Sequence, residues 1–298
     1  MEEICTFLEN HGIGYTCDKE LSRVSAMALG GRSKIFATPK SEPELIKLIE
    51  FLSAGKYKYK VVGRMTNLLP PDGEYNGIIV STEKLRGFSP DNGILTIQCG
   101  ESFSKIAKKL AKMGYGGIAQ LSGIPGSVGG MVYSNAGAFG LEIKDILIDA
   151  RCYSVSDGAI YNVAASDMEF SYRRSILSRG GLILMSARFN LSRQRPEFAE
   201  SEILRLTRER REKQPTNLPS LGSAFLRPEG HSAAKLIDDA GLRGYSIGGA
   251  SVSKKHAGFI VNTGGATAED VKRLIEYIKE QVYQRLGVLL VPEIEILE

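Results

Sequence analysis

The stretch Ser122-Gly-Ile-Pro-Gly-Ser-Val-Gly-Gly130, followed shortly by Asn135-Ala-Gly-Ala-Phe-Gly140, decides the fold of this chain. Both pieces lie in a segment, residues 114–140, that holds nine of the 33 glycines. Glycine lets the backbone approach a partner closely, and successive N–H groups form nests for anions such as phosphate. A set of tight turns would need the same glycines. The residues alone leave both interpretations open.

Three familiar motifs are disfavoured around this run. Gly114-Tyr-Gly-Gly-Ile-Ala119 resembles the dinucleotide-binding pattern G-x-G-x-x-A, but it follows a predicted helix instead of a strand, which favours a helix cap. The P-loop pattern, with its Gly-Lys pair before Ser or Thr, does not occur. Ser127 lacks the preceding glycine of a nucleophile elbow, because Pro125 stands there. The motifs therefore argue against a hydrolase and against a nucleoside triphosphatase.

The composition is that of a globular protein with a sizeable core. The 298 residues are 43% hydrophobic and 24% charged, with a formal net charge of +4. This mild excess suits a small anionic ligand and is too small to indicate nucleic acid. The four cysteines form no C-x-x-C pair, so we expect reduced thiols and no metal site. Without a signal peptide or an apolar run of about 18 residues, we expect a cytoplasmic protein with no membrane insertion.

The periodicity of apolar residues predicts an α+β chain of two domains. Helices are predicted at 41–55, where Ser41 and Glu44 form a capping box, and at about 102–113. Further helices are predicted at 203–213, at about 232–240, and from Thr267 to Gly287. Strands are predicted at 59–63, 78–80, 94–99, 146–155, 160–163, 182–191 and 288–297, with a two-residue hairpin turn at 157–158. We expect domains at 1–195 (subdomains about 1–80 and 81–195) and 196–298.

The glycine run and Asn135–Gly140 resemble the flavin-binding core of the UDP-N-acetylenolpyruvoylglucosamine reductase (MurB) family. Four further stretches match this family in order along the chain. They are Leu29-Gly-Gly31, Phe170-Ser-Tyr-Arg-Arg-Ser175, Gly222-Ser-Ala-Phe-Leu-Arg-Pro228, and Lys255-His-Ala-Gly-Phe-Ile-Val-Asn262 with the following Thr263-Gly-Gly265. The short spacing between Arg173 and Ser223 fits the type II form, which lacks a tyrosine-bearing loop. The resemblance covers nearly the whole chain.

The resemblance implies a fold and a reaction. The fold is a PCMH-type FAD-binding domain, similar to vanillyl-alcohol oxidase, built of two α/β subdomains, plus a smaller α/β substrate-binding domain. In the family, NADPH reduces non-covalently bound FAD, and flavin N5 then passes hydride to the enolpyruvyl group of UDP-N-acetylglucosamine enolpyruvate. Protonation at the α-carbon gives UDP-N-acetylmuramate for peptidoglycan. We therefore expect FAD as cofactor and NADPH and the sugar nucleotide as partners.

The resemblance assigns three catalytic residues. Arg173 stands at the position of the family arginine that stabilises charge on the substrate carboxylate, a task suited to a guanidinium. Its neighbour Arg174 is expected to face solvent. Ser223 matches the serine that protonates the α-carbon. Glu293 matches the active-site glutamate, which the last strand is expected to return to the site, although its neighbour Glu295 would alternate in the same way on an edge strand.

Two further sets of residues follow from the same resemblance. The set expected to bind FAD comprises Gly63, Arg64, Thr66, Asn67, Leu68, Ser122, Gly123, Ile124, Pro125, Gly126, Ser127, Gly129, Gly130, Asn135, Gly137 and Ala138. The set expected to bind the substrate comprises Tyr172, Arg227, Lys255 and His256. The basic cluster 205–211 is expected to be a solvated helix face.

One position departs from the family pattern. The family has G-x-G-S-N-L-L at the first pyrophosphate turn, and this chain has Gly63-Arg-Met-Thr-Asn-Leu-Leu69, so that Met65 replaces the second glycine. If this position needs a positive φ, methionine adds about 1–2 kcal/mol of strain and its side chain can crowd the cofactor. Weaker FAD retention is the resulting hypothesis. Two other functions stay open: a flavin- or nucleotide-binding protein without turnover, and another PCMH-type oxidase.

Overall fold

The computed structural model describes residues 1–298, which form two compact units. The first unit comprises Met1–Cys17, Ile35–Arg64 and Gly77–Arg208, and the second comprises Asp18–Lys34, Met65–Asn76 and Glu209–Glu298. Each unit has its own hydrophobic core. The expected boundary near residue 195 falls inside the third segment of the first unit, and the division into FAD-binding and substrate-binding domains stays a prediction.

Two large sheets contain most of the strands up to residue 190. The first has the order β1-β2-β5-β3, with β3 and β5 parallel, and the second has the order β12-β11-β13-β7-β6, antiparallel throughout. The strands of the first sheet are β1 (Gly14–Glu20), β2 (Arg32–Thr38), β3 (Tyr59–Val62) and β5 (Glu74–Ser81). Those of the second are β6 (Phe88–Asp91), β7 (Ile94–Gln98), β11 (Leu147–Ser154), β12 (Ile160–Ala164) and β13 (Leu182–Asn190).

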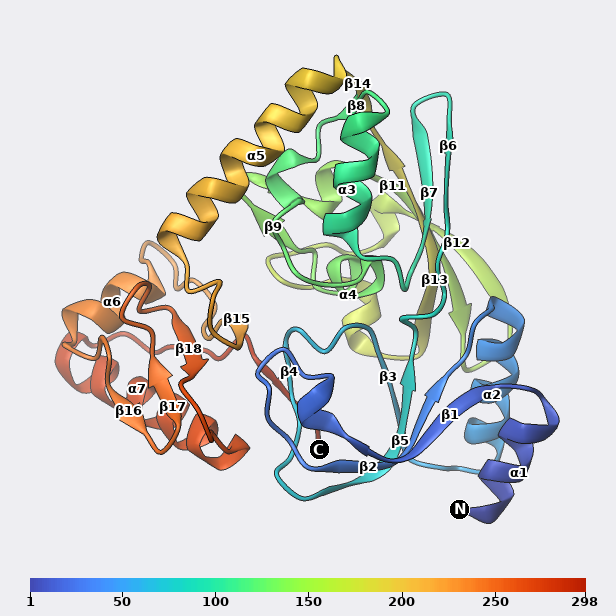
Figure 1. Cartoon of the computed structure of the whole chain (residues 1–298), viewed down its shortest axis with the longest axis horizontal. Coiled ribbons are helices and arrows are strands. Elements are labelled where there is room, and N and C mark those ends of the chain that lie inside the picture. Colours follow the sequence, from blue (N-terminus) through green and yellow to red (C-terminus); the bar gives the residue numbers. More distant parts are fainter. The chain divides into compact units, whose positions relative to one another are not determined.

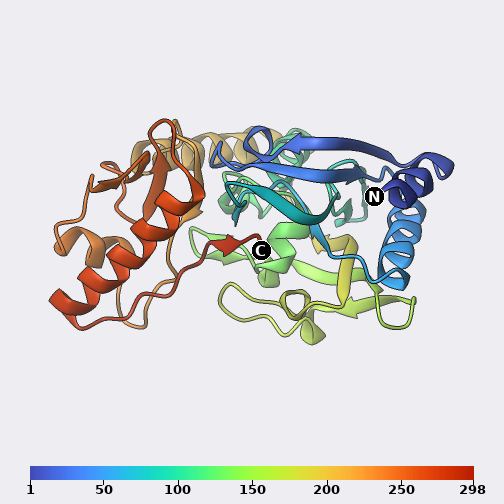
Figure 2. The same cartoon turned by 90° about the horizontal axis from the view of Figure 1, so that it is seen from below.

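Four helices pack within the first unit. They are α1 (Glu2–Asn10), α2 (Glu42–Ala54), α3 (Phe103–Lys112) and α4 (Val128–Tyr133). Helices α1 and α2 lie side by side (Figures 1 and 2), with the rings of Phe7 and Phe51 stacked 3.9 Å apart. Helix α3 sets Phe103 edge-on to Phe189 of β13, and α4 also contacts β13. Two short pairs, β8 (Tyr115–Gly116) with β14 (Ser192–Arg193) and β9 (Gly137–Ala138) with β10 (Leu141–Glu142), complete the unit.

The second unit is built on the antiparallel sheet β15-β18-β17-β16. Its strands are β15 (Ser220–Ser223), β16 (Ser246–Ile247), β17 (Ala250–Val252) and β18 (Phe259–Asn262). Helix α7 (Ala268–Leu286) packs across β16 and β17, with α6 (Ala233–Asp239) beside it (Figure 1). A short parallel pair joins β4 (Leu68–Leu69) to β19 (Glu295–Ile296). Helix α5 (Pro196–Lys213) passes from the first unit into the second.

Helix α7 shows how local sequence sets an element. Thr267 and Asp270 form a complete capping box at its start, and Gly287, with φ of +70°, ends it in the left-handed conformation. The carboxylate of Asp72 adds two further hydrogen bonds, accepting the N–H groups of Ala268 at 2.6 Å and Glu269 at 3.0 Å. These contacts hold segment Met65–Asn76 against the start of α7 within the second unit.

Most predicted elements are confirmed with ends shifted by one or two residues, and four predictions are wrong in part. At α2 the Ser41 hydroxyl accepts the Glu44 N–H, but the Glu44 carboxylate accepts the N–H of Lys40 instead of Ser41. Helix α5 begins at Pro196, because proline suits a first helical turn, and not at residue 203. The hairpin connection between β11 and β12 is longer than two residues, since Tyr153 pairs with Ile160. Helix α1 and strands β1 and β2 precede the first predicted element.

The predicted last strand, 288–297, is mostly irregular. Only Glu295–Ile296 forms a strand, and Pro292 makes a single antiparallel bridge to Phe225. The preceding residues instead make single hydrogen bonds, from Leu226 N to Val291 O at 2.9 Å and from Glu293 N to Ala224 O at 2.9 Å.

Candidate functional site

The glycine run of the first unit is packed tightly around the start of α4. The Ser127 hydroxyl caps this helix by accepting the N–H of Gly130 at 3.3 Å. A Cβ atom at Gly63 would lie 2.1 Å from this hydroxyl oxygen, so only glycine allows the two segments to approach. A Cβ at Gly137 would lie 2.7 Å from the Glu142 side chain. Close packing therefore accounts for part of the glycine content.

The same run keeps N–H groups that can serve an anion. Internal hydrogen bonds use the N–H groups of Ser122, Ile124, Val128, Gly129 and Gly130. The remaining N–H donors of the run belong to Gly123, Gly126 and Ser127, and Gly126 and Ser127 are buried. Gly126 has a φ of +157°. The small side chains and these donors fit the diphosphate of a dinucleotide cofactor such as FAD.

Arg173 lies at the tip of a tight turn in the first unit. The N–H and C=O groups of Ser171 and Arg174 bond to one another across this turn, at 3.1 and 3.2 Å. Arg173 has a φ of +59°, a conformation that costs a residue with a side chain about 1–2 kcal/mol. Its guanidinium donates to Gly137 O at 3.4 Å and lies 5.0 Å from the centre of the Tyr172 ring. Arg173 is half-buried, and Tyr172 and Arg174 are exposed, as expected for Arg174.

Ser223 and Glu293 come together in the second unit. Ser223 ends β15 and is exposed, directly after Gly222, whose φ is +81°. Glu293 is half-buried, and its N–H donates to the carbonyl of Ala224, the neighbour of Ser223, at 2.9 Å. The chain between them, residues 224–292, thus returns the two predicted catalytic residues to adjacent backbone segments.

Asn67, expected to bind the cofactor, holds the backbone beside Glu293. Its side-chain amide donates to Glu293 O at 2.9 Å, and its carbonyl accepts the N–H of Glu295 at 3.0 Å. Leu68 pairs with Glu295 in the β4–β19 ladder and is buried, while Thr66 is half-buried. No pattern in the sequence indicates these contacts, because 226 positions separate Asn67 from Glu293.

Arg64 and Met65, in the same stretch, belong to different units. Arg64 belongs to the first unit, where its guanidinium lies 3.3 Å from the Glu83 carboxylate. Met65 belongs to the second unit, where its carbonyl accepts the N–H of Ala26 at 3.2 Å. Met65 has a φ of +47° and is only 4% exposed. The condition behind the strain at this position, a positive φ, is therefore met.

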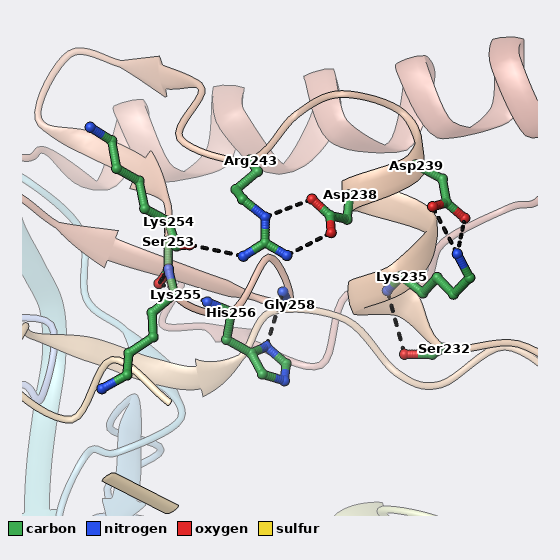
Figure 3. Close-up of polar contacts among 10 residues, drawn as sticks. All are labelled: Ser232, Lys235, Asp238, Asp239, Arg243, Ser253, Lys254, Lys255, His256 and Gly258. Atoms are coloured by element: carbon green, nitrogen blue, oxygen red, sulfur yellow. Dashed lines mark hydrogen bonds and ion pairs between the residues drawn. The ribbon is translucent and has the colours of Figure 1, made fainter. Parts of the chain in front are cut away.

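The turn Ser253–Gly258 carries Lys255 and His256 (Figure 3). The Ser253 hydroxyl accepts the N–H groups of Lys255 at 3.1 Å and His256 at 3.3 Å. Arg243 braces the turn, donating to Lys254 O at 2.8 Å while its fork contacts both Asp238 carboxylate oxygens at 2.6 Å. The side chains of Lys254 and Lys255 point away from this guanidinium in Figure 3.

The residues expected to bind the substrate, and the basic cluster 205–211, differ in their contacts and exposure. The Lys255 ammonium donates to the carbonyl of Arg211, near the C-terminal end of α5, where a cation is favoured. Arg227 is exposed. In the basic cluster, Arg205, Arg208 and Arg211 are exposed, and Arg210 is half-buried, with its pKa lowered by that burial.

His256 is expected to be neutral at pH 7 with its proton on Nε2. Burial lowers the pKa of His256 and the charge of Arg243 acts in the same direction, while Nδ1 accepts the N–H of Gly258 at 3.2 Å. Since the folded pKa lies below the usual value of about 6.5, the free energy of unfolding should fall as pH decreases below that value.

Nitrogen-detected NMR should give a pKa of His256 below 6.5 and an Nε2–H tautomer. In His256→Gln this pH dependence should weaken, and in His231→Gln, an exposed control, it should stay. A His256 pKa at or above 6.5 contradicts the prediction.

Three further properties complete the description. No group of three or more His, Cys, Asp or Glu side chains is placed to hold a metal ion. No helix has the length and apolar character that a membrane span requires. Burial raises the pKa of the thiols of Cys99 and Cys152 to about 12, which makes both unreactive at neutral pH.

Comparison with known proteins agrees with this geometry. Residues 33–164 match the FAD binding domain family, and residues 214–297 match the C-terminal domain family of UDP-N-acetylenolpyruvoylglucosamine reductase. The predicted class is confirmed: the chain is an FAD-dependent oxidoreductase with an α+β fold.

The chain belongs to the UDP-N-acetylenolpyruvoylglucosamine reductase family. The reductase of Caldicellulosiruptor saccharolyticus is 42% identical over 292 residues, which cover 97% of this chain and 93% of that protein. The reductase of Streptococcus thermophilus strain LMD-9 is 38% identical and covers 96% and 94% of the two chains. The crystal structure of the enzyme from Thermus caldophilus superposes with a TM-score of 0.80 at 29% identity, covering 95% of this chain and 98% of that one.

Proposed function

We propose that this chain reduces UDP-N-acetylglucosamine enolpyruvate to UDP-N-acetylmuramate with NADPH, a step of peptidoglycan synthesis that takes place in the cytoplasm. The observation that carries the proposal is the hydrogen bond from Glu293 N to the carbonyl of Ala224, the residue after Ser223, which joins the two segments that carry these residues. A carboxyl group and a hydroxyl group on joined segments suit a reaction that ends with protonation of a carbon. The likeness to named reductases over nearly the whole chain supports it.

FAD fits the donors of the glycine run and is proposed to bind without a covalent bond. When bound, FAD would supply the redox chemistry of the site, which is hydride transfer between NADPH and the vinyl carbon of the substrate. In the first unit, the N–H groups of Gly123, Gly126 and Ser127 are proposed to receive the diphosphate. Gly137 and Ala138, which are half-buried and small, offer backbone to a flat ring.

Arg173 is proposed to stabilise the negative charge that develops on the substrate carboxylate. Its guanidinium donates to a backbone carbonyl and lies against Tyr172, so its position is set before substrate arrives. A donor that needs no reorganisation stabilises a transition state more than a flexible one does. The left-handed φ of Arg173 is backbone strain of the kind that concentrates at functional sites.

Ser223 is proposed to protonate the α-carbon and Glu293 to assist at the carboxylate. A serine hydroxyl is a weak acid, but the carbanion formed after hydride transfer is a far stronger base. The positive φ of Gly222 turns the chain just before Ser223 and leaves this hydroxyl exposed at the strand end. Asn67 and the Ala224 carbonyl hold the backbone of Glu293 from two directions.

The substrate diphosphate is proposed to meet the basic side chains of the second unit. Arg227 is exposed and offers a planar fork for phosphate oxygens. His256, kept neutral by burial, offers an Nε2–H donor at physiological pH. Lys255 has two ammonium protons besides the one that it donates to Arg211 O.

A simple assay tests the proposal. The purified protein should show a flavin spectrum and oxidise NADPH in proportion to added enolpyruvyl sugar nucleotide, forming UDP-N-acetylmuramate by mass spectrometry. Bound flavin without substrate-dependent oxidation, even with added FAD, would indicate a binding protein that lacks turnover. NADPH-independent reduction of the flavin by an alcohol would indicate another PCMH-type oxidase.

Met65→Gly tests the departure at the first pyrophosphate turn. The positive φ of Met65 is backbone strain that lowers folding stability, and the Met65 side chain is the part that can crowd FAD. Loss of this buried side chain costs about 2–5 kcal/mol, against a gain of about 1–2 kcal/mol from relief of strain. We therefore expect Met65→Gly to have a lower melting temperature but to retain more FAD after gel filtration. Stoichiometric, tightly held FAD in the unmodified protein would refute the crowding hypothesis.

A further inference from the structure

We propose that Asn135 is a positioning residue that holds the Arg173 turn in its active geometry and is not a ligand of the cofactor. The inference rests on the proposed function, since it gives Asn135 its effect through Arg173. It replaces the expected role of Asn135 in FAD binding with a different one.

The Asn135 side chain is enclosed by the first unit. The residue is 0% exposed, and both hydrogens of its amide already have acceptors within the unit. The amide nitrogen donates to Glu142 Oε2 at 3.0 Å and to Ser171 O at 3.1 Å, and Oδ1 accepts the N–H of Lys144 at 3.0 Å. One buried side chain thus joins the glycine-rich segment to two other segments, one at Glu142–Lys144 and one at Ser171.

One of these contacts reaches the base of the Arg173 turn. Ser171 is the first residue of that turn, so the bond from Asn135 fixes the carbonyl from which the turn departs. On the other side, the buried Ser175 hydroxyl donates to Tyr133 O at 2.8 Å. At the tip, Arg173 itself donates to Gly137 O at 3.4 Å. All three tethers run to the five residues 133–137.

Asparagine suits this position for two physical reasons. Its φ is +42°, a left-handed conformation that asparagine tolerates better than most residues with side chains. Its amide supplies two donor hydrogens and an acceptor, which match the two acceptors and one donor around it. Aspartate would set a carboxylate oxygen against the Glu142 carboxylate and the Ser171 carbonyl.

The consequence is that the strained conformation of Arg173 depends on Asn135. A residue with φ of +59° keeps that conformation only where its surroundings hold it. Without the tether at Ser171, the turn can relax and move the guanidinium. A displacement of about 1 Å at a group that contacts the reacting atoms is enough to slow a reaction about 100-fold.

The test is a double-mutant cycle of Asn135→Gly with Arg173→Lys, measured by stopped-flow on the FAD-loaded enzyme. Glycine tolerates the positive φ and removes the side chain together with its amide. We expect Asn135→Gly to keep FAD content and the rate of flavin reduction by NADPH within about twofold, and to slow flavin reoxidation by the enolpyruvyl substrate about 10–100-fold. The double variant should be no slower than Arg173→Lys alone, because both changes act on one group.

Controls separate this role from general destabilisation. Thr38→Val removes a partly buried side-chain hydrogen bond to Gly14 O in another sheet of the first unit, and it should leave both half-reactions unchanged. Asn135→Ser, whose single hydroxyl hydrogen cannot serve both Glu142 and Ser171, is used if the glycine variant does not fold, with the same expected pattern. Loss of FAD content in the Asn135 variants, or multiplicative effects in the cycle, would overturn the inference. If the unmodified enzyme does not turn over the sugar nucleotide, the proposed function fails instead.

Discussion

Ser223→Ala is expected to leave the reduction of FAD by NADPH unchanged and to slow the reaction of the reduced enzyme with the enolpyruvyl substrate by about 10²–10⁴-fold, the usual contribution of a positioned proton donor. The reason is that hydride transfer produces a carbanion, which reverts unless a proton is delivered to it. Ser223 is exposed at the end of β15, next to the segment that carries Glu293. Anaerobic stopped-flow absorbance of the flavin measures the two half-reactions separately.

Ser220→Ala provides the matched control on the same strand. Ser220 is half-buried three positions earlier in β15, and its replacement should leave both half-reactions unchanged. Solvent deuterium should appear at the α-carbon of the product with the unmodified enzyme. If Ser223→Ala slows both half-reactions equally, Ser223 supports flavin binding and is not the proton donor.

The second large effect is expected for Arg173→Lys. Lysine keeps the positive charge and has the same difficulty with a positive φ, so the change removes only the planar fork of donors. Loss of a preorganised donor to a developing negative charge slows the chemical step by about 10²–10³-fold. The rate of flavin reduction by NADPH should remain, while reoxidation by substrate slows.

Arg174→Lys is the control for Arg173. Arg174 occupies the next position of the same turn and is exposed, so its replacement should change neither half-reaction by more than about twofold. Equal effects from the two replacements would show that no single guanidinium of the turn is positioned for the reaction. An unaltered reoxidation rate in Arg173→Lys would remove Arg173 from the proposed mechanism.

Local signals in the sequence predicted the ends of an element accurately where the element carries its own capping residues. The helix after Thr267 begins and ends at the predicted residues because the capping box and Gly287 act within one turn of the backbone. The segment 288–297 failed as a strand because its partners, Ala224, Asn67 and Leu69, come from distant parts of the chain and meet it only at single points. The hydrophobic pattern of 288–297 is typical of a strand, but a continuous ladder of hydrogen bonds also needs a neighbouring strand along its length.

The glycine-rich run was the feature from which the fold followed, and its ordered companions along the chain indicated the family and the catalytic types at Arg173, Ser223 and Glu293. Those conclusions needed only residue identity and order. Tertiary structure alone decided which side chains hold the backbone at and beside these residues. Asn135 reaches Ser171 across 36 positions, and Asn67 reaches Glu293 across 226. A buried amide binds whichever backbone groups folding brings within about 3 Å, and no local pattern records that distance.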